Sequence, residues 1–194
     1  DFEEKHLYAK HFEHEDPTKP KVFISELLVE KFSLNLQKVI NSLIDQVKEE
    51  DVLADNFIYS GTHWSLDYDT YKMLLDESEY AAWTAAWGYR ANHFTVSINY
   101  LNNYNTIQAV NETLKKAGFL LNTSGGEIKG TPAVMLEQSA TLADEYRVKF
   151  SDLEVEIPSC FYEFAFRYNK SNGELYTGFV PASANKIFES TNRR

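Results

Sequence analysis

The stretch GYRANHFTVSIN (Gly88–Asn99) contains the pattern from which the fold can be predicted. From His93 onward it alternates between polar residues (His93, Thr95, Ser97, Asn99) and apolar residues (Phe94, Val96, Ile98). A β-strand directs successive side chains to opposite faces, so the stretch predicts a strand with one polar and one apolar face. If water covers the polar face, His93 is an ordinary surface residue. If that face lines a cavity, with Phe94, Val96 and Ile98 packed beneath it, His93 is a candidate metal ligand or base.

The segments around this strand predict a chain that mixes helices and strands. Helices are expected over 33–48 with Ser33 as N-cap, over 67–87 ended by Gly88, and over 105–118 with Asn105 as N-cap. Short strands are expected at 6–14, 21–30, 119–122, 134–141, 145–150, 153–158, 160–168 and 174–180. This order predicts an α+β fold with a mostly antiparallel sheet. No Pro- or Ser-rich linker divides residues 1–194, which are therefore expected to form a single domain.

Composition narrows the functional classes. The chain has 194 residues, of which 43% are hydrophobic and 14% aromatic, and this favours a folded globular protein. The net charge is −10 and the only cluster of basic residues is Arg193–Arg194, so nucleic acid is an unsuitable partner. No apolar run approaches the roughly 18 residues that cross a bilayer. Cys160 is the single cysteine, which excludes an internal disulfide and favours a reducing, cytoplasmic location.

A second candidate lies in the late strand FYEFAFRY (Phe161–Tyr168). Alternation places Glu163 on the face of Ala165 and Arg167, opposite the aromatic residues Tyr162, Phe164, Phe166 and Tyr168. Because burial of an unpaired carboxylate is costly, two environments are possible for Glu163. Either it pairs with Arg167 on a solvated face, or it binds a cation in a cavity.

Weaker candidates have ordinary structural explanations. His6, His11 and His14 could form a metal cluster, but their acidic neighbours and Pro17 suit a solvated strand and turn. His63 in GTHW is expected in a loop, and Cys160 is expected to be a packed thiol because no general base is near it in sequence. These residues alone indicate a candidate metal site built from His and Glu, and they do not indicate a reaction.

Five strings, taken together and in order, resemble the 2-oxoadipate dioxygenase/decarboxylase family of the vicinal oxygen chelate superfamily. They are KVFISELLVE (21–30), SEYAAWTAAWGYRANHFTVSIN (78–99), LKKAGFLLNTSGGEIKGTPAVMLEQSAT (114–141), IPSCFYEFAFRYN (157–169) and NKIFEST (185–191). The resemblance covers nearly the whole chain. It implies βαβββ modules, with added helices, that form a cupped, mostly antiparallel sheet around a metal.

The resemblance also implies an activity and a site. Members use Fe(II), held by two histidines and one carboxylate, to convert 2-oxoadipate and O₂ to 2-hydroxyglutarate and CO₂ in lysine catabolism. The matching positions are His93 and Glu163 as metal ligands and Arg167 as a partner of Glu163. Thr95 is expected near the substrate, and Ser183, in the segment Pro181–Ser183, is expected to contact it. A homodimer is a further implication.

One family motif has no counterpart. The first histidine ligand of the family lies in a string resembling DHIAFRT, which this sequence lacks, so that ligand is expected before Asp1. Residues 1–194 are then expected to lack part of the first module, to bind iron weakly and to be nearly inactive, unless His11 or His63 substitutes. Two other functions are open: a glyoxalase-like metal-dependent isomerase or hydrolase, and a non-catalytic binding protein that has lost its site.

Overall fold

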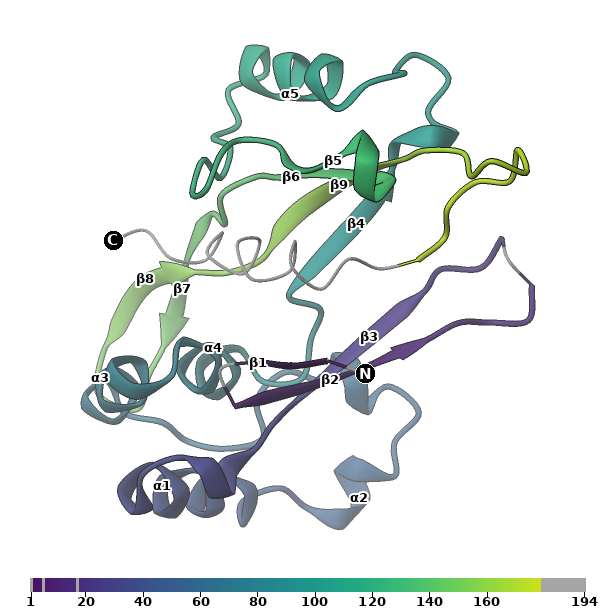
Figure 1. Cartoon of the computed structure of the whole chain (residues 1–194). Helices are drawn as coiled ribbons and strands as arrows, with labels where there is room; N and C mark the ends of the chain where they lie inside the picture. Colours follow the sequence, from purple (N-terminus) through teal and green to yellow (C-terminus); the bar gives the residue numbers. More distant parts are fainter. Residues whose placement is uncertain (1, 5, 17, 179–194) are drawn as a thin grey trace. The chain divides into compact units, whose positions relative to one another are not determined.

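The computed structural model describes residues 2–4, 6–16 and 18–178, and it groups the chain into two compact units (Figure 1). Unit 1 contains residues 1–90 and 147–155, and unit 2 contains residues 91–146 and 156–194. Each unit combines helices with a sheet, so the protein has a mixed α+β structure. None of the helices in the described part of the chain is long and apolar enough to span a membrane.

Unit 1 begins with a three-stranded antiparallel sheet in the order β1-β2-β3. Its strands are β1 (Phe2–Glu4), β2 (Leu7–Phe12) and β3 (Val22–Leu27). Helix α1 (Leu34–Ile44) follows, and the hydroxyl of Ser33 accepts a hydrogen bond from Leu36 N at 3.2 Å, which confirms the predicted N-cap. The helix ends four residues before the predicted Lys48, and the short α2 (Glu49–Val52) comes next.

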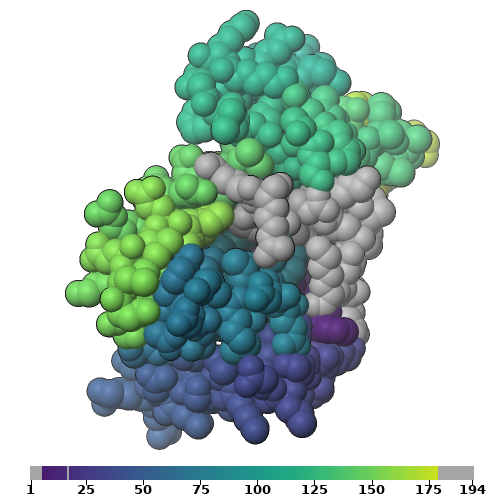
Figure 2. All heavy atoms as spheres, turned by 90° about the vertical axis from the view of Figure 1, so that its left-hand side faces the viewer, coloured from purple at the N-terminus to yellow at the C-terminus, as the bar shows by residue number. Residues whose placement is uncertain are grey.

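The segment 67–87 forms two helices where the sequence predicted one. These are α3 (Tyr68–Glu77) and α4 (Glu79–Trp87). Ser78 between them is extended (φ −151°, ψ 111°), and its hydroxyl accepts from Ala81 N, so it caps a new helix. The space-filling view shows the segment of α3 and α4 packed against the segment of α1 (Figure 2). Helices α1 and α3 are in contact.

Gly88 ends α4, as predicted, with a positive φ of 69°. The backbone there runs so close to Gly61 that a Cβ on Gly88 would lie 2.1 Å from Gly61 O. Gly61 and Tyr89 also exchange backbone hydrogen bonds of 3.0 and 2.9 Å. Because Gly88 has no Cβ, the end of α4 can pack directly against the loop at Gly61. The chain then enters unit 2 at residue 91.

Unit 2 follows the chain order strand, helix, strand, strand, strand. Its elements are β4 (His93–Ser97), α5 (Ile107–Lys116), β5 (Lys129–Thr131), β6 (Leu136–Ala140) and β9 (Phe161–Arg167). The sheet order is β4-β9-β6-β5, with β4 parallel to β9 and the other pairs antiparallel. A separate two-stranded sheet is formed by β7 (Glu145–Lys149) and β8 (Glu154–Pro158), and the division between the units falls within it.

Several boundaries in unit 2 differ from those predicted. Thr106, rather than Asn105, caps α5 by accepting from Ala109 N. The predicted strand at 119–122 is reduced to one bridge, between Leu121 and Thr141. For the predicted strand at 174–180, the described residues show only a bridge between Asn169 and Leu175.

The sheet of unit 2 has two different faces. One is covered by α5, through a cluster of Ile98, Ile107 and Val110 with Phe164 and Phe166 packed against it. The expectation that Phe94 packs beneath the strand is wrong, because 56% of its surface is exposed. The opposite face carries Glu163 and Ala165, which are 5% and 1% exposed. The sequence left both a solvated and a buried environment open for Glu163, and the structure shows the buried one.

Candidate metal site

The parallel pairing of β4 and β9 brings His93 and Glu163 together. Its register sets His93 opposite Phe161 and Thr95 opposite Glu163, so all four residues share one face of the sheet. His93 Nε2 lies 3.9 Å from Glu163 Oε2. The two candidates from distant parts of the sequence thus lie side by side.

The His93 ring is held on two sides. It stacks on Phe161, with 4.8 Å between ring centroids and 12° between the planes. Its Nδ1 lies 3.2 Å from Asn92 Oδ1, and because a carbonyl oxygen only accepts, Nδ1 is the donor in this contact. That assignment leaves a lone pair on Nε2, the nitrogen that faces Glu163.

Glu163 is held by a neighbouring strand. Gln138 on β6 donates from Nε2 to Glu163 Oε1, and both side chains are buried. The cationic groups of Arg167 and Lys129 are near enough to stabilise the carboxylate electrostatically. Even so, burial dominates, and it raises the pKa of the Glu163 carboxyl to about 7.

Burial acts on His93 in the opposite sense. It lowers the pKa of the imidazole to about 4, because the packed surroundings disfavour the charged ring although 25% of the side chain still contacts solvent. At neutral pH the pair is therefore a neutral imidazole beside a carboxyl that is partly protonated. It is not an ordinary ion pair of His⁺ and Glu⁻.

Such a pair suits a divalent metal. Metals bind neutral imidazole and ionised carboxylate, and a cation would remove the cost of burying the Glu163 charge. Metal–ligand distances of about 2.1 Å mean that one ion can contact two donors separated by this gap. Among the described residues, no group of three His, Cys, Asp or Glu side chains gathers as a metal site. The described part of the chain thus offers two donors of the expected three.

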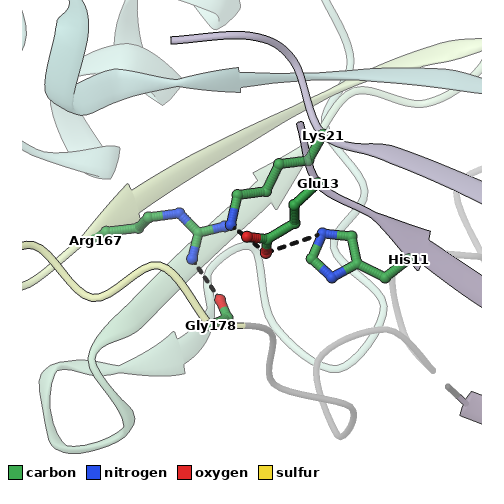
Figure 3. Close-up of polar contacts among 5 residues, drawn as sticks. All are labelled: His11, Glu13, Lys21, Arg167 and Gly178. Atoms are coloured by element: carbon green, nitrogen blue, oxygen red, sulfur yellow. Dashed lines mark hydrogen bonds and ion pairs between the residues drawn. The ribbon is translucent and has the colours of Figure 1, made fainter. Parts of the chain in front are cut away.

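Three other residues were expected at or near the site: Thr95, Arg167 and Ser183. Thr95 sits opposite Glu163 in the β4–β9 register, but its side chain is exposed. Arg167 lies four residues after Glu163 on the same strand and donates from Nη1 to Gly178 O at 2.6 Å (Figure 3). Ser183 and the segment Pro181–Ser183 lie outside the described residues.

The histidines considered as substitutes belong to unit 1 and have contacts of their own. His11 Nε2 lies 3.5 Å from Glu13 Oε1, the same oxygen that accepts from Lys21 at 2.6 Å (Figure 3). His63 lies 3.2 Å from Asp51 Oδ2 through Nδ1 and 2.6 Å from Ser60 Oγ through Nε2. Neither is in a three-residue metal cluster of the described chain.

A pocket of about 270 Å³ also lies in unit 1, lined by residues that include Trp64, Ala86 and Phe150. It contains neither His93 nor Glu163, and its lining offers Lys149 as its one charged residue. We therefore place the candidate chemistry at the buried pair of unit 2.

Gln138 is the site residue that the sequence analysis missed. In the strand LEQSA, Leu136, Gln138 and Ala140 alternate onto one face, and all three are buried. A polar residue at the middle of an inward-facing row was the available signal. Lys129 is also buried and lies opposite Gln138 in the β5–β6 register. It too was not predicted from the sequence.

Comparison with known proteins places the chain in a family. The family model for 2-oxoadipate dioxygenase/decarboxylase matches residues 8–170. The 2-oxoadipate dioxygenase/decarboxylase, chloroplastic, of Arabidopsis thaliana is 37% identical over an alignment of 187 residues that covers 89% of this chain and 50% of the relative. The chain thus spans about half the length of this curated relative.

Solved structures share the fold. A protein from Shewanella frigidimarina NCIMB 400, named only as a hydrolase, has a TM-score of 0.88 and 66% identity over 93% of this chain and 71% of its own. Hydroxyglutarate synthase from Oryza sativa, in complex with 2-oxoadipate, has a TM-score of 0.85 and 32% identity over 97% and 69% of the two chains. A glyoxalase superfamily protein from Ralstonia eutropha JMP134 has a TM-score of 0.69 but 19% identity, over 90% and 61%, and shows likeness of fold alone.

The predicted cytoplasmic location is contradicted, because the curated relative is named chloroplastic. The single cysteine indicated a reducing environment, which does not distinguish one reducing compartment from another. The family assignment, in contrast, is confirmed by the sequence model and the relatives together. The chain belongs to the 2-oxoadipate dioxygenase/decarboxylase family.

Proposed function

We propose that the protein is an iron(II)-dependent dioxygenase that decarboxylates 2-oxoadipate and converts it to 2-hydroxyglutarate. The observation that carries this proposal is the buried pair of His93 and Glu163, with 3.9 Å between Nε2 and Oε2. A hydroxyglutarate synthase with a similar fold has been solved with 2-oxoadipate, which supports the substrate class. The βαβββ order of unit 2 would then form a cupped sheet around the metal, as in the vicinal oxygen chelate superfamily.

In this proposal His93 supplies a neutral nitrogen donor and Glu163 an anionic oxygen donor. Bound iron(II) would supply Lewis acidity toward the 2-oxo acid and the redox capacity to use O₂. The protein's own part is to keep the imidazole unprotonated, through burial against Phe161, and to exclude bulk water from Glu163. Two of the three protein ligands are then assigned, and the third would be a second histidine.

Nearby charges support an anionic substrate. Lys129 is 5% exposed, and its charge and that of Arg167 both act on Glu163. A 2-oxo dicarboxylate carries two negative charges, so cations near the metal would help to offset its desolvation. Thr95 and Ser183 are proposed to contact the substrate, and Arg167 to support Glu163. A homodimer and a role in lysine catabolism are expected from the family resemblance.

The proposal is tested by oxygen uptake with the intact, iron-loaded protein. Addition of 2-oxoadipate should consume O₂ and release CO₂ in equal amounts, with 2-hydroxyglutarate as the product. His93→Ala and Glu163→Ala should lose nearly all turnover. His14→Ala is the matched control, because His14 is exposed and bonds only locally in the described chain, accepting from Asp16 N. Wild-type turnover by both site variants would contradict the assignment.

A glyoxalase-like isomerase or hydrolase is the second candidate. It is favoured by the fold shared with a glyoxalase superfamily protein and by the name of the Shewanella relative. Such enzymes need a divalent metal but no O₂, so metal-dependent turnover under anaerobic conditions would support this candidate over the oxygenase. If the protein binds no metal, the result would instead support the third hypothesis, a non-catalytic binding protein.

A further inference from the structure

We propose that Gln138 positions Glu163 for metal binding, by occupying one carboxylate oxygen and leaving the other for the cation. This inference rests on the proposed function, because it assumes that Glu163 is a metal ligand. Gln138 itself is assigned neither a ligand nor a catalytic role. It acts through Glu163.

Strand pairing fixes the two side chains beside each other. In the antiparallel register of β6 and β9, Gln138 is opposite Ala165 and Ala140 is opposite Glu163, so Gln138 and Glu163 are diagonal neighbours on one face. Each is 5% exposed. The small side chains of Ala140 and Ala165 leave the diagonal open, so the amide can reach the carboxylate.

The hydrogen bond makes the two oxygens of Glu163 unequal. Gln138 Nε2 donates to Oε1, whereas Oε2 is the oxygen that lies 3.9 Å from His93 Nε2. A cation beside His93 would therefore meet a carboxylate whose rotation is already restricted. Partners that orient a metal ligand in this way commonly change metal affinity by about 10–100-fold.

The other end of the same amide argues against a purely structural role. Gln138 Oε1 is buried and has no hydrogen-bond partner among the described residues. A buried polar atom without a partner is unfavourable, and an apolar residue of similar length would avoid that cost. An amide at this position is best explained by its donor group, which serves Glu163.

Metal affinity is the direct test, with the intact protein and cobalt(II) as the probe. We compare wild type with Gln138→Met, which keeps the length but removes the donor, and with Gln138→Asn, whose side chain is one methylene shorter and carries the amide farther from Glu163. Gln108→Met is the matched control, because Gln108 lies exposed on α5. His93→Ala establishes whether binding occurs at this site.

Both Gln138 variants should bind cobalt(II) about 10–100-fold more weakly than wild type, while Gln108→Met binds equally. At saturating cobalt, the visible spectrum of the Gln138 variants should also change, since an unrestrained carboxylate can coordinate through both oxygens. A purely structural role would leave that spectrum unchanged. Binding within about twofold of wild type by either folded variant would overturn the inference while leaving the metal site in place.

Wild type supplies a measurement that does not depend on any variant at position 138. The chain has four glutamines (Gln37, Gln46, Gln108, Gln138), so their side-chain amide signals can be assigned by substituting the other three. Cobalt(II) should shift or broaden the Gln138 amide signals most strongly. Unaffected Gln138 signals would overturn the inference. If His93→Ala binds cobalt(II) as wild type does, the proposed metal site itself fails, and the role of Gln138 fails with it.

Discussion

Replacement of Glu163 by glutamine should stabilise the metal-free protein at alkaline pH, even though it removes a proposed metal ligand. Glu163 is 5% exposed, and burial raises its pKa from 4.5 to about 7. In the folded protein the carboxyl therefore loses its proton only at a cost. Glu163→Gln keeps the shape, still accepts from Gln138, and cannot ionise.

The sign and size follow from proton linkage. Well below pH 4.5 the carboxyl is protonated in both folded and unfolded chains, so it costs nothing. As the pH rises from there through about 7, the unfolded chain ionises first, and the wild-type protein loses stability. Because one pKa unit corresponds to about 1.4 kcal/mol, the full loss above pH 8 is about 3 kcal/mol. Glu163→Gln should be more stable than wild type by about that amount.

Urea unfolding in the presence of a chelator measures this difference at pH 5 and pH 8. The difference should be below about 1 kcal/mol at pH 5 and close to its full value at pH 8. Glu127→Gln is the matched control, because the hydrogen bond from Lys115 lowers the pKa of Glu127, so this variant should be destabilised at pH 8. A Glu163→Gln protein that is less stable than wild type at pH 8 would refute the argument. It would mean that the ionised carboxylate is satisfied by the protein alone.

Two further predictions concern the scaffold. Asp67→Ala should destabilise the protein by about 1 kcal/mol at pH 7, because Asp67 caps α3 by accepting from Thr70 N and Thr70 Oγ1. These bonds lower its pKa, so in urea unfolding the difference should decrease as the pH falls through that lowered value. Gly88→Ala should cost about 2 kcal/mol or more by thermal unfolding, since φ is +69° and the new Cβ would meet Gly61 O. Gly118→Ala has a positive φ but nothing within 4 Å, and a loss as large as that of Gly88→Ala would count against the clash.

The sequence predicted local features of the fold well where one residue controls them. Ser33 as an N-cap and Gly88 as a helix end depend on short-range hydrogen bonding and on backbone conformation, and both were confirmed. The break at Ser78 was missed because Met, Leu and Glu before it and Glu and Ala after it all favour helix. A serine hydroxyl competes with the helix there by capping the next one.

The candidate site could be predicted only in part, for a physical reason. Alternation identified His93 and Glu163 as polar strand residues, and the family resemblance paired them. Nothing local in the sequence sets β4 parallel to β9, or β6 beside β9, and these pairings bring Gln138 to Glu163. Alternation also cannot tell which face of a strand is buried, and here the face of Glu163 is buried while 53% of Tyr162 is exposed.

The central claim is that His93 and Glu163 hold one iron ion between them. Diffraction data collected at the iron absorption edge from crystals of the intact protein, grown anaerobically with iron(II), test it most directly. The anomalous map should show one strong peak within bonding distance of both His93 Nε2 and Glu163 Oε2. A peak bound to other residues, with this pair still in mutual contact and no ion between them, would contradict the claim.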